Sequence, residues 1–187
     1  RDMLMPTLDA RVEAHNVTLV PLPLFHPTAQ TAQMNGGVSG GWTVVLLPRF
    51  EPGAVLHAFE TEQISCWIGV PTMYWTLLQH ARREGLDVSK VAASLRCCVS
   101  RGAPMPLAVL EDFEKTFHVR VLEGYGLSET SPVACFNQVF KPSKPGTVGL
   151  PIGGCEIRIV GDDDRAVATG ERGEVGIRGH NVMKGYY

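Results

Sequence analysis

Short apolar runs alternate with amphipathic segments along the first two thirds of the chain. Five of these runs are bounded by Gly, Pro or charged residues, and each has the length and composition of a buried strand. The five predicted strands are Leu19–Leu22, Val44–Leu47, Ile64–Val70, Leu95–Val99 and Val119–Leu122.

Three amphipathic helices are expected between these strands. Two of them begin near Pro52 and Pro106, because proline suits the first turn of a helix. Apolar residues recur at helical spacing at Val55, Leu56 and Phe59, at Met73, Leu77 and Leu78, and at Leu107, Leu110 and Phe113. Strands that alternate with helices predict an α/β fold, in which layers of helices cover a largely parallel sheet.

Ligands bind such sheets beyond the carboxyl ends of the strands. The candidate functional loops are therefore those that follow Leu22, Val70, Val99 and Leu122.

The pattern changes at Lys141, where proline and glycine become frequent. Two short alternating runs follow, Glu156–Val160 and Glu174–Arg178, and such runs are typical of antiparallel β structure. We therefore expect residues 1–140 to form an α/β subdomain and residues 141–187 to form the beginning of a β-rich subdomain.

Composition and charge narrow the functional classes. The 187 residues carry a formal net charge of −2, and 44% of them are hydrophobic. This balance is typical of a globular protein and offers no basic footprint for nucleic acid or an anionic membrane. No apolar stretch approaches the roughly 20 residues that a bilayer span needs. The five cysteines form no Cys-x-x-Cys pair, so we expect core thiols in a reducing, cytoplasmic setting.

The strongest candidate site is the loop Glu123–Thr130, which directly follows a predicted strand. Two glycines free its backbone, and Tyr125 between them offers an aromatic face to a base. The hydroxyl of Ser128 could bind a phosphate oxygen, and the carboxylate of Glu129 is a suitable ligand for Mg²⁺. The alternative is a glycine-rich turn, with polar capping residues and a core tyrosine.

Three other strand-end loops give weaker signals. Small residues in Ser100–Pro104 would let the backbone approach a flat ligand, or would simply turn the chain into the next helix. In Pro23–Thr28, His26 could line an apolar pocket or be structural. The loop Val70–Tyr74 could form a pocket wall, or cap a helix through Thr72.

Five segments follow one another in a fixed order along the chain. They are Pro23–His26, Gly102–Pro104, Gly124–Thr130, Gly149–Pro151 and Gly173–Tyr186. In order and spacing they resemble the motifs of the adenylate-forming superfamily, which includes acyl-CoA synthetases, luciferase-type enzymes and peptide-synthetase adenylation domains. The resemblance covers nearly the whole chain from Leu19 onward. The segments Gly-Leu-Ser-Glu-Thr-Ser-Pro and Asn-Val-Met-Lys-Gly-Tyr-Tyr are most similar to fatty-acyl-CoA ligases.

The resemblance implies roles for the residues that match its motifs. Tyr125 would stack on adenine, and Glu123 would accept a hydrogen bond from the adenine amino group. Ser128 would bind the α-phosphate, and Glu129 would hold Mg²⁺. The other nucleotide-binding residues would be Gly102, Ala103, Pro104, Gly124 and Gly126. The acyl group would be approached by His26, Thr72, Met73, Val133 and Ala134. Arg101 stands where many relatives have glycine.

The implied activity is that of an ATP-dependent acyl-CoA synthetase. Such an enzyme activates a carboxylic acid, here a medium- or long-chain fatty acid, as acyl-AMP and transfers it to coenzyme A. An aryl-acid–CoA ligase, a peptide-synthetase-type adenylation domain and a non-catalytic scaffold segment stay open as alternatives. A dinucleotide-binding oxidoreductase is disfavoured because no Gly-x-Gly-x-x-Gly opens a helix after the first strand.

The resemblance also predicts that the chain is an internal segment of the large N-terminal domain of such an enzyme. The phosphate loop of the family would precede the His26 segment, and the catalytic lysine would follow Tyr187. We therefore expect the chain alone to be inactive in adenylation. Apolar surface exposed at its two ends would favour association into homo-oligomers.

Overall fold

The computed structural model of the chain describes residues 16–138 and 141–187. Within these residues the main sheet has seven strands in the order β2-β1-β3-β4-β5-β6-β7, and a second sheet pairs β8 with β9. The main sheet comprises β1 (Val17–Val20), β2 (Thr43–Leu46), β3 (Cys66–Gly69), β4 (Cys97–Ser100), β5 (Val121–Tyr125), β6 (Cys135–Phe136) and β7 (Leu150–Pro151). Strands β1 to β5 are parallel, whereas β6 and β7 are antiparallel. The predicted α/β fold with a largely parallel sheet is therefore confirmed.

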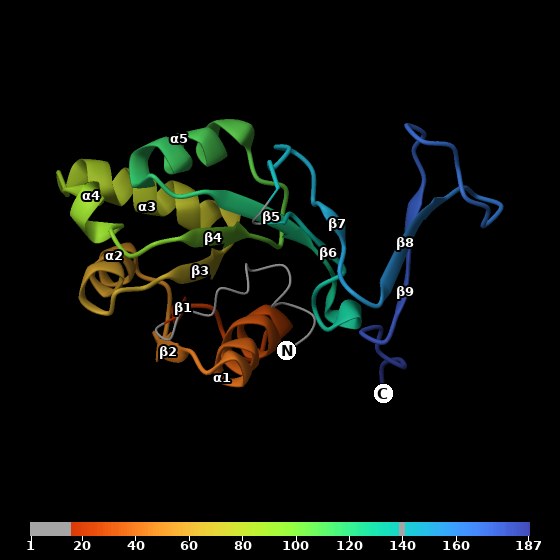
Figure 1. Cartoon of the computed structure of the whole chain (residues 1–187), viewed down its shortest axis with the longest axis horizontal. Helices are drawn as coiled ribbons and strands as arrows, with labels where there is room; N and C mark the ends of the chain where they lie inside the picture. Colours follow the sequence, from red (N-terminus) through yellow and green to blue (C-terminus); the bar gives the residue numbers. More distant parts are fainter. Residues whose placement is uncertain (1–15, 139–140) are drawn as a thin grey trace.

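Helices cover both faces of the main sheet (Figure 1). One face carries α2 (Pro52–Thr61), α3 (Pro71–Arg83), α4 (Val88–Val91) and α5 (Leu107–Phe117). The opposite face carries η1 (Thr28–Asn35), which is a π-helix, and α1 (Gly36–Gly40). A single 3-10 turn, η2 (Ser128–Thr130), follows β5.

Local sequence signals set the ends of the longer helices. Pro52 occupies the first turn of α2, where its missing N–H group costs nothing. The carboxylate of Glu51 caps the same end by accepting from the amides of Gly53 at 3.0 Å and Ala54 at 2.6 Å. Helix α5 ends at His118, whose φ of 52° places it in the left-handed region that terminates helices.

The larger core lies between the main sheet and helices α2 to α5. Trp67 of β3, Tyr74 of α3 and Phe113 of α5 have no exposed surface. The ring centroid of Tyr74 lies 4.7 Å from that of Trp67 and 4.8 Å from that of Phe113. Burial of each such side chain contributes about 1.5–3 kcal/mol, so this cluster fixes the helical layer on the sheet.

On the opposite face, η1 and α1 are tied to the sheet by one polar and one steric contact. The Nε2 of buried Gln33 donates to the main-chain oxygen of Leu19 at 2.8 Å. Gly37 approaches β2 so closely that a Cβ there would lie 2.8 Å from Cγ2 of Val44. A smaller core cluster on this face includes Ala32, Ile68 and Leu122.

The second sheet consists of β8 (Cys155–Val160) and β9 (Glu174–Gly179), which pair antiparallel along their full length. The antiparallel β structure expected after Lys141 is therefore present. The change of pattern at Lys141 does not coincide with the change of sheet, because β7 still pairs with β6 of the main sheet. A division of the chain between residues 140 and 141 stays a prediction.

The cysteines behave as the sequence predicts. All five are free thiols, and four of them are buried while Cys97 is half-buried. In the part of the chain that the structure describes, no helix is long and apolar enough to cross a membrane.

The parallel register brings the candidate loops to one edge of the sheet. Gly69 at the end of β3 pairs with Ser100 at the end of β4, and Ser100 pairs with Glu123 of β5. The loops that follow these three strands therefore leave the sheet side by side at its carboxyl edge, where ligands bind in α/β sheets.

Candidate functional site

The loop after β5 is a tight turn that returns the chain to β6. A Cβ on Gly126 would lie 2.0 Å from the main-chain oxygen of Pro132, so no larger residue fits without a backbone shift. The side chain of buried Thr130 bridges the turn, with its Oγ1 accepting from the amide of Leu127 at 2.8 Å. The amide of Ala134 donates to the oxygen of Tyr125 at 2.9 Å and closes the loop. The loop is thus held in one conformation by its own backbone.

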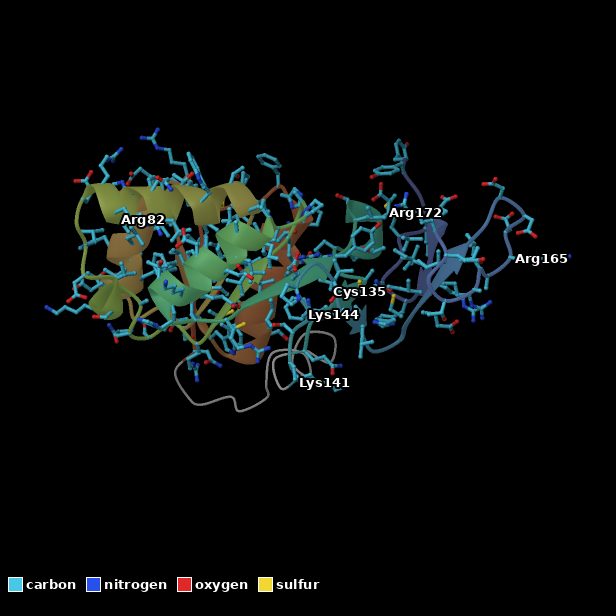
Figure 2. All side chains as sticks on the ribbon, turned by 90° about the horizontal axis from the view of Figure 1, so that it is seen from above. Arg82, Cys135, Lys141, Lys144, Arg165 and Arg172 are labelled. Carbon is cyan, nitrogen blue, oxygen red and sulfur yellow. The ribbon has the colours of Figure 1, made fainter. Side chains whose placement is uncertain are left out.

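Tyr125 ends β5 with its side chain half-buried, at the boundary between the two sheets. Its ring lines an apolar cavity of about 350 Å³. The other lining residues are Cys135, Val148, Gly149, Pro151, Ile157, Ile159 and Val175. Figure 2 shows Cys135 where the main body meets the two-stranded sheet. The cavity therefore lies between the aromatic residue of the loop and β8–β9.

The predicted loop Gly102–Pro104 is exposed and does not line this cavity. Gly102 has a φ of +85°, which favours glycine, and a Cβ there would touch Cγ1 of Val70 at 3.4 Å. This contact places the loop after β4 beside the loop after β3. The two halves of the predicted adenine site thus share the carboxyl edge of the sheet, although only Tyr125 lines the cavity.

Glu123 and Gly124 are buried in β5 rather than presented on the loop. The Oε2 of Glu123 accepts from the amide of Gly146 at 3.1 Å, which ties β5 to the segment before β7. A Cβ on Gly124 would lie 2.6 Å from Cδ2 of Phe136, so glycine is required where β6 packs against β5.

Ser128 and Glu129 form the first turn of η2 and face outward. Ser128 is exposed and Glu129 is half-buried. The Oε1 of Glu129 accepts from the hydroxyl of Tyr186 at 2.7 Å. This hydrogen bond from Tyr186 lowers the pKa of the Glu129 carboxyl, and it raises the pKa of the tyrosine hydroxyl. Glu129 is therefore an ionised carboxylate at neutral pH.

An ionised carboxylate on an open turn fits a magnesium ion. Mg²⁺ in proteins is commonly held by one or two carboxylates, with substrate phosphates and waters completing six ligands. Within the described residues, no group of three or more His, Cys, Asp or Glu could hold a metal ion.

The chain after β9 packs against the same loop (Figure 1). Asn181, which is 4% exposed, donates from Nδ2 to the oxygens of Thr130 at 3.1 Å and Val133 at 2.8 Å. The amide of Met183 donates to the oxygen of Glu129 at 2.8 Å. We call residues 181–186 the clamp, because they make four hydrogen bonds to η2 and the chain that follows it, the fourth being that of Tyr186.

Arg101 joins the loops after β4 and β5. Its Nη2 donates to the oxygen of Pro132 at 2.6 Å, and its side chain is buried. Burial lowers the pKa of Arg101 to about 10, so the guanidinium remains charged at neutral pH.

The residues expected around the acyl group do not pack into one cluster. His26 is exposed, and its Nδ1 accepts from the amide of Thr28 at 3.1 Å. Thr72 is exposed in the first turn of α3, while neighbouring Met73 packs against the larger core. Val133 and Ala134 belong to the smaller core on the other side of the sheet.

Sequence reasoning attached no individual role to Asn181 or Tyr186. Both lie about 50 residues beyond the loop that they contact, so no local pattern indicates the contact. Their place in the last of the five ordered segments was the one available signal.

Comparisons with known proteins identify the family and the fold. The family model described as "AMP-binding enzyme" matches residues 2–187. The long-chain-fatty-acid–CoA ligase of Bacillus subtilis is 35% identical over 89% of this chain and 29% of its own length. The feruloyl-CoA synthase of an Amycolatopsis species is 36% identical over 90% of this chain and 34% of its own length.

Solved structures give the same result. ATP-bound MatB from Rhodopseudomonas palustris superimposes with a TM-score of 0.88 at 26% identity, covering 98% of this chain and 35% of that one. O-succinylbenzoate coenzyme A synthetase from Bacillus subtilis in complex with AMP gives a TM-score of 0.81 at 32% identity, covering 96% and 36%. The chain spans about a third of the length of these relatives. Because the family model matches nearly every residue, the chain belongs to the AMP-binding enzyme family.

Proposed function

We propose that the chain supplies the adenylate-binding core of an ATP-dependent acid–CoA ligase. The observation that carries the proposal is the turn after β5, where Tyr125, Ser128 and Glu129 follow one another at the carboxyl edge of a parallel sheet. An aromatic face, a hydroxyl and an ionised carboxylate are the groups that a base, a phosphate and its cation require. The ATP- and AMP-bound structures among its neighbours support the same assignment.

The proposed reaction has two steps. A substrate carboxylate attacks the α-phosphate of ATP, which gives acyl-AMP and releases pyrophosphate. The thiol of coenzyme A then attacks the acyl carbon, which gives the thioester and releases AMP. Tyr125 would hold adenine, Ser128 would donate to the α-phosphate, and Gly102, Ala103 and Pro104 would limit the adenine on its other side.

Magnesium would neutralise phosphate charge as it develops in the first step. Glu129 is the residue of this chain that would hold it. Because the loop is held in place by Gly126, Thr130 and the clamp, Glu129 would need little reorganisation when the ion arrives.

A medium- or long-chain fatty acid is the proposed substrate. An apolar groove of about 570 Å³ lies beside the Pro23–His26 segment, within the size range of small-molecule sites, and none of the five residues expected to approach the acyl group lines it. Its walls include Leu22, Leu24, Phe25 and Leu46. The fatty-acid ligase relative supports this choice, while the feruloyl and succinylbenzoate relatives keep an aryl acid as the second candidate. A cytoplasmic setting, favoured by five free thiols, is part of the proposal.

The test measures pyrophosphate release with ATP, Mg²⁺ and a panel of acids. The protein is expressed at the full length that its gene encodes, and the panel runs from hexanoate to palmitate, with ferulate, indoleacetate and succinylbenzoate. We expect release that depends on a fatty acid and falls about 100-fold or more in Glu129→Gln. No acid-dependent release with any member of the panel would refute the proposed activity. A clear preference for an aryl acid would replace the substrate assignment.

A further inference from the structure

A single carboxylate that binds Mg²⁺ must have a fixed orientation. Mg²⁺ accepts only near-octahedral geometry at short ligand distances. Glu129 has a flexible side chain on a half-exposed turn, so its carboxylate would rotate freely without a partner. The partner that the structure provides is the Tyr186 hydroxyl, 2.7 Å from Oε1.

The hydrogen bond from Tyr186 places the two carboxylate oxygens of Glu129 in different environments. Tyr186 is the side-chain donor to Oε1, and the amide of Glu129 itself also acts on this carboxylate. A carboxylate whose one oxygen is held by a donor presents the other to a cation. Partners of this kind set the orientation of metal ligands and typically change metal affinity or activity 10- to 100-fold when lost.

The clamp holds Tyr186 where it can make this contact. Asn181 bonds both Thr130 and Val133, and Met183 bonds the main chain of Glu129 itself. The chain that leads to Tyr186 is thus anchored to this turn by Asn181 and Met183, while the Tyr186 side chain itself is exposed. The adjacent Tyr187 offers the same side chain one position away from the residue that bonds Oε1.

We propose that Tyr186 is a positioning residue for the magnesium carboxylate: its hydrogen bond to Oε1 orients the Glu129 carboxylate, which would hold the ion. This inference rests on the proposed function. It assigns to the clamp a role in cation affinity, beyond joining β9 to the loop.

The test compares Tyr186→Phe with the matched control Tyr187→Phe, in the protein at the full length that its gene encodes. Mn²⁺ replaces Mg²⁺ as the probe, and its binding in the presence of a non-hydrolysable ATP analogue is followed by electron paramagnetic resonance. We expect Tyr186→Phe to weaken Mn²⁺ binding about 10-fold or more, and Tyr187→Phe to bind as the wild type. In turnover, excess Mg²⁺ should restore the kcat of Tyr186→Phe, because only occupancy of the ion is impaired.

A double-mutant cycle separates positioning from a general structural effect. If Tyr186 acts through Glu129, Tyr186→Phe has no further effect on binding of the ATP analogue in a Glu129→Gln background. Equal Mn²⁺ affinity of the two phenylalanine variants would overturn the inference, and so would a loss that persists in the Glu129→Gln background. If the wild type itself binds neither Mn²⁺ nor the ATP analogue, the proposed function fails instead.

Discussion

The Nη2 of Arg101 lies 2.6 Å from the main-chain oxygen of Pro132, and the arginine is only 6% exposed. Arg101 follows β4 directly, and Pro132 lies in the chain that follows η2. The bond therefore holds the two candidate nucleotide loops together at the carboxyl edge of the sheet. A buried hydrogen bond from a charged group is worth more than a neutral one, so this contact is a principal tie between the loops.

Removal of the Arg101 side chain should loosen both loops. Arg101→Ala leaves the oxygen of Pro132 without its donor, and we expect the free energy of unfolding to fall by about 1–3 kcal/mol. The affinity of the Arg101→Ala protein for AMP should also fall, because both loops would be less firmly held. Urea unfolding and calorimetric titration measure the two effects.

Arg82→Ala provides the control for Arg101→Ala. Arg82 forms an exposed ion pair with Asp112 on the helical face, far from the loops (Figure 2). Exposed pairs are worth about 1 kcal/mol or less, so stability should change little and AMP affinity not at all. Similar losses in the two variants would contradict the role given to Arg101.

Gly126 should be irreplaceable for steric reasons. In Gly126→Ala the new Cβ would meet the backbone of Pro132 at 2.0 Å, and backbone cannot move aside as a side chain does. We expect a loss of about 1–3 kcal/mol in unfolding free energy and loss of nucleotide binding. Gly153→Ala is the matched control, since a Cβ there meets nothing within 4 Å. A stable, AMP-binding Gly126→Ala protein would show that the turn is not as tight as described.

Asn181 should matter more for stability than its neighbour. Asn181→Ala leaves the buried oxygens of Thr130 and Val133 without their donor, and each lost bond costs about 1–3 kcal/mol. Val182 is exposed, so Val182→Ala should change stability by less than about 0.5 kcal/mol. Chemical denaturation of the two variants tests the difference. Equal stabilities would mean that the clamp is not held by Asn181.

Cys97 should be the most reactive of the five thiols at neutral pH. A hydrogen bond from the Cys66 side chain lowers the pKa of Cys97, and the charge of Arg120 acts in the same direction. Burial raises the pKa of Cys98, Cys135 and Cys155. A lower pKa gives more thiolate at a given pH, so alkylation of Cys97 should level off at a lower pH than alkylation of the other four thiols.

Mass spectrometry after brief treatment with iodoacetamide identifies the reactive thiol. Cys97→Ser should remove the fast phase of alkylation, and Cys155→Ser should leave it unchanged. If a buried cysteine of the folded protein were alkylated faster than Cys97, the assignment would be contradicted.

The parallel strands and the long helices were predictable because their signals are local. Apolar runs, proline in first helical turns and helical spacing of Leu77 and Leu78 depend only on neighbouring residues. The observed strand ends differ from the predicted ones by one to three residues, because pairing with adjacent strands decides where each strand stops. The ordered motifs located the turn after β5 because Gly124, Tyr125 and Gly126 lead from the last residues of the strand directly into the turn.

Other elements have no local signal. The segment that forms η1 and α1 lacks apolar residues at helical spacing, and its structure depends on Gln33 reaching Leu19 and on Gly37 packing against β2. Strands β6 and β7 have two residues each, and they exist because Cys135 pairs with Pro151 across the sequence. The contact of Tyr186 with Glu129 likewise depends on the fold that joins the two segments.

The most direct test of the central claim is the effect of an acyl-adenylate on thermal unfolding. Melts of the full-length protein are recorded with and without a non-hydrolysable long-chain acyl-adenylate analogue, for the wild type, Tyr125→Ala and Tyr187→Ala. At 100-fold excess over its Kd, the analogue should stabilise the wild type and Tyr187→Ala by about 2.7 kcal/mol. Loss of base stacking, worth about 1–3 kcal/mol, should remove much of this shift in Tyr125→Ala. An absent shift in the wild type, or an undiminished one in Tyr125→Ala, would contradict a nucleotide site at the turn after β5.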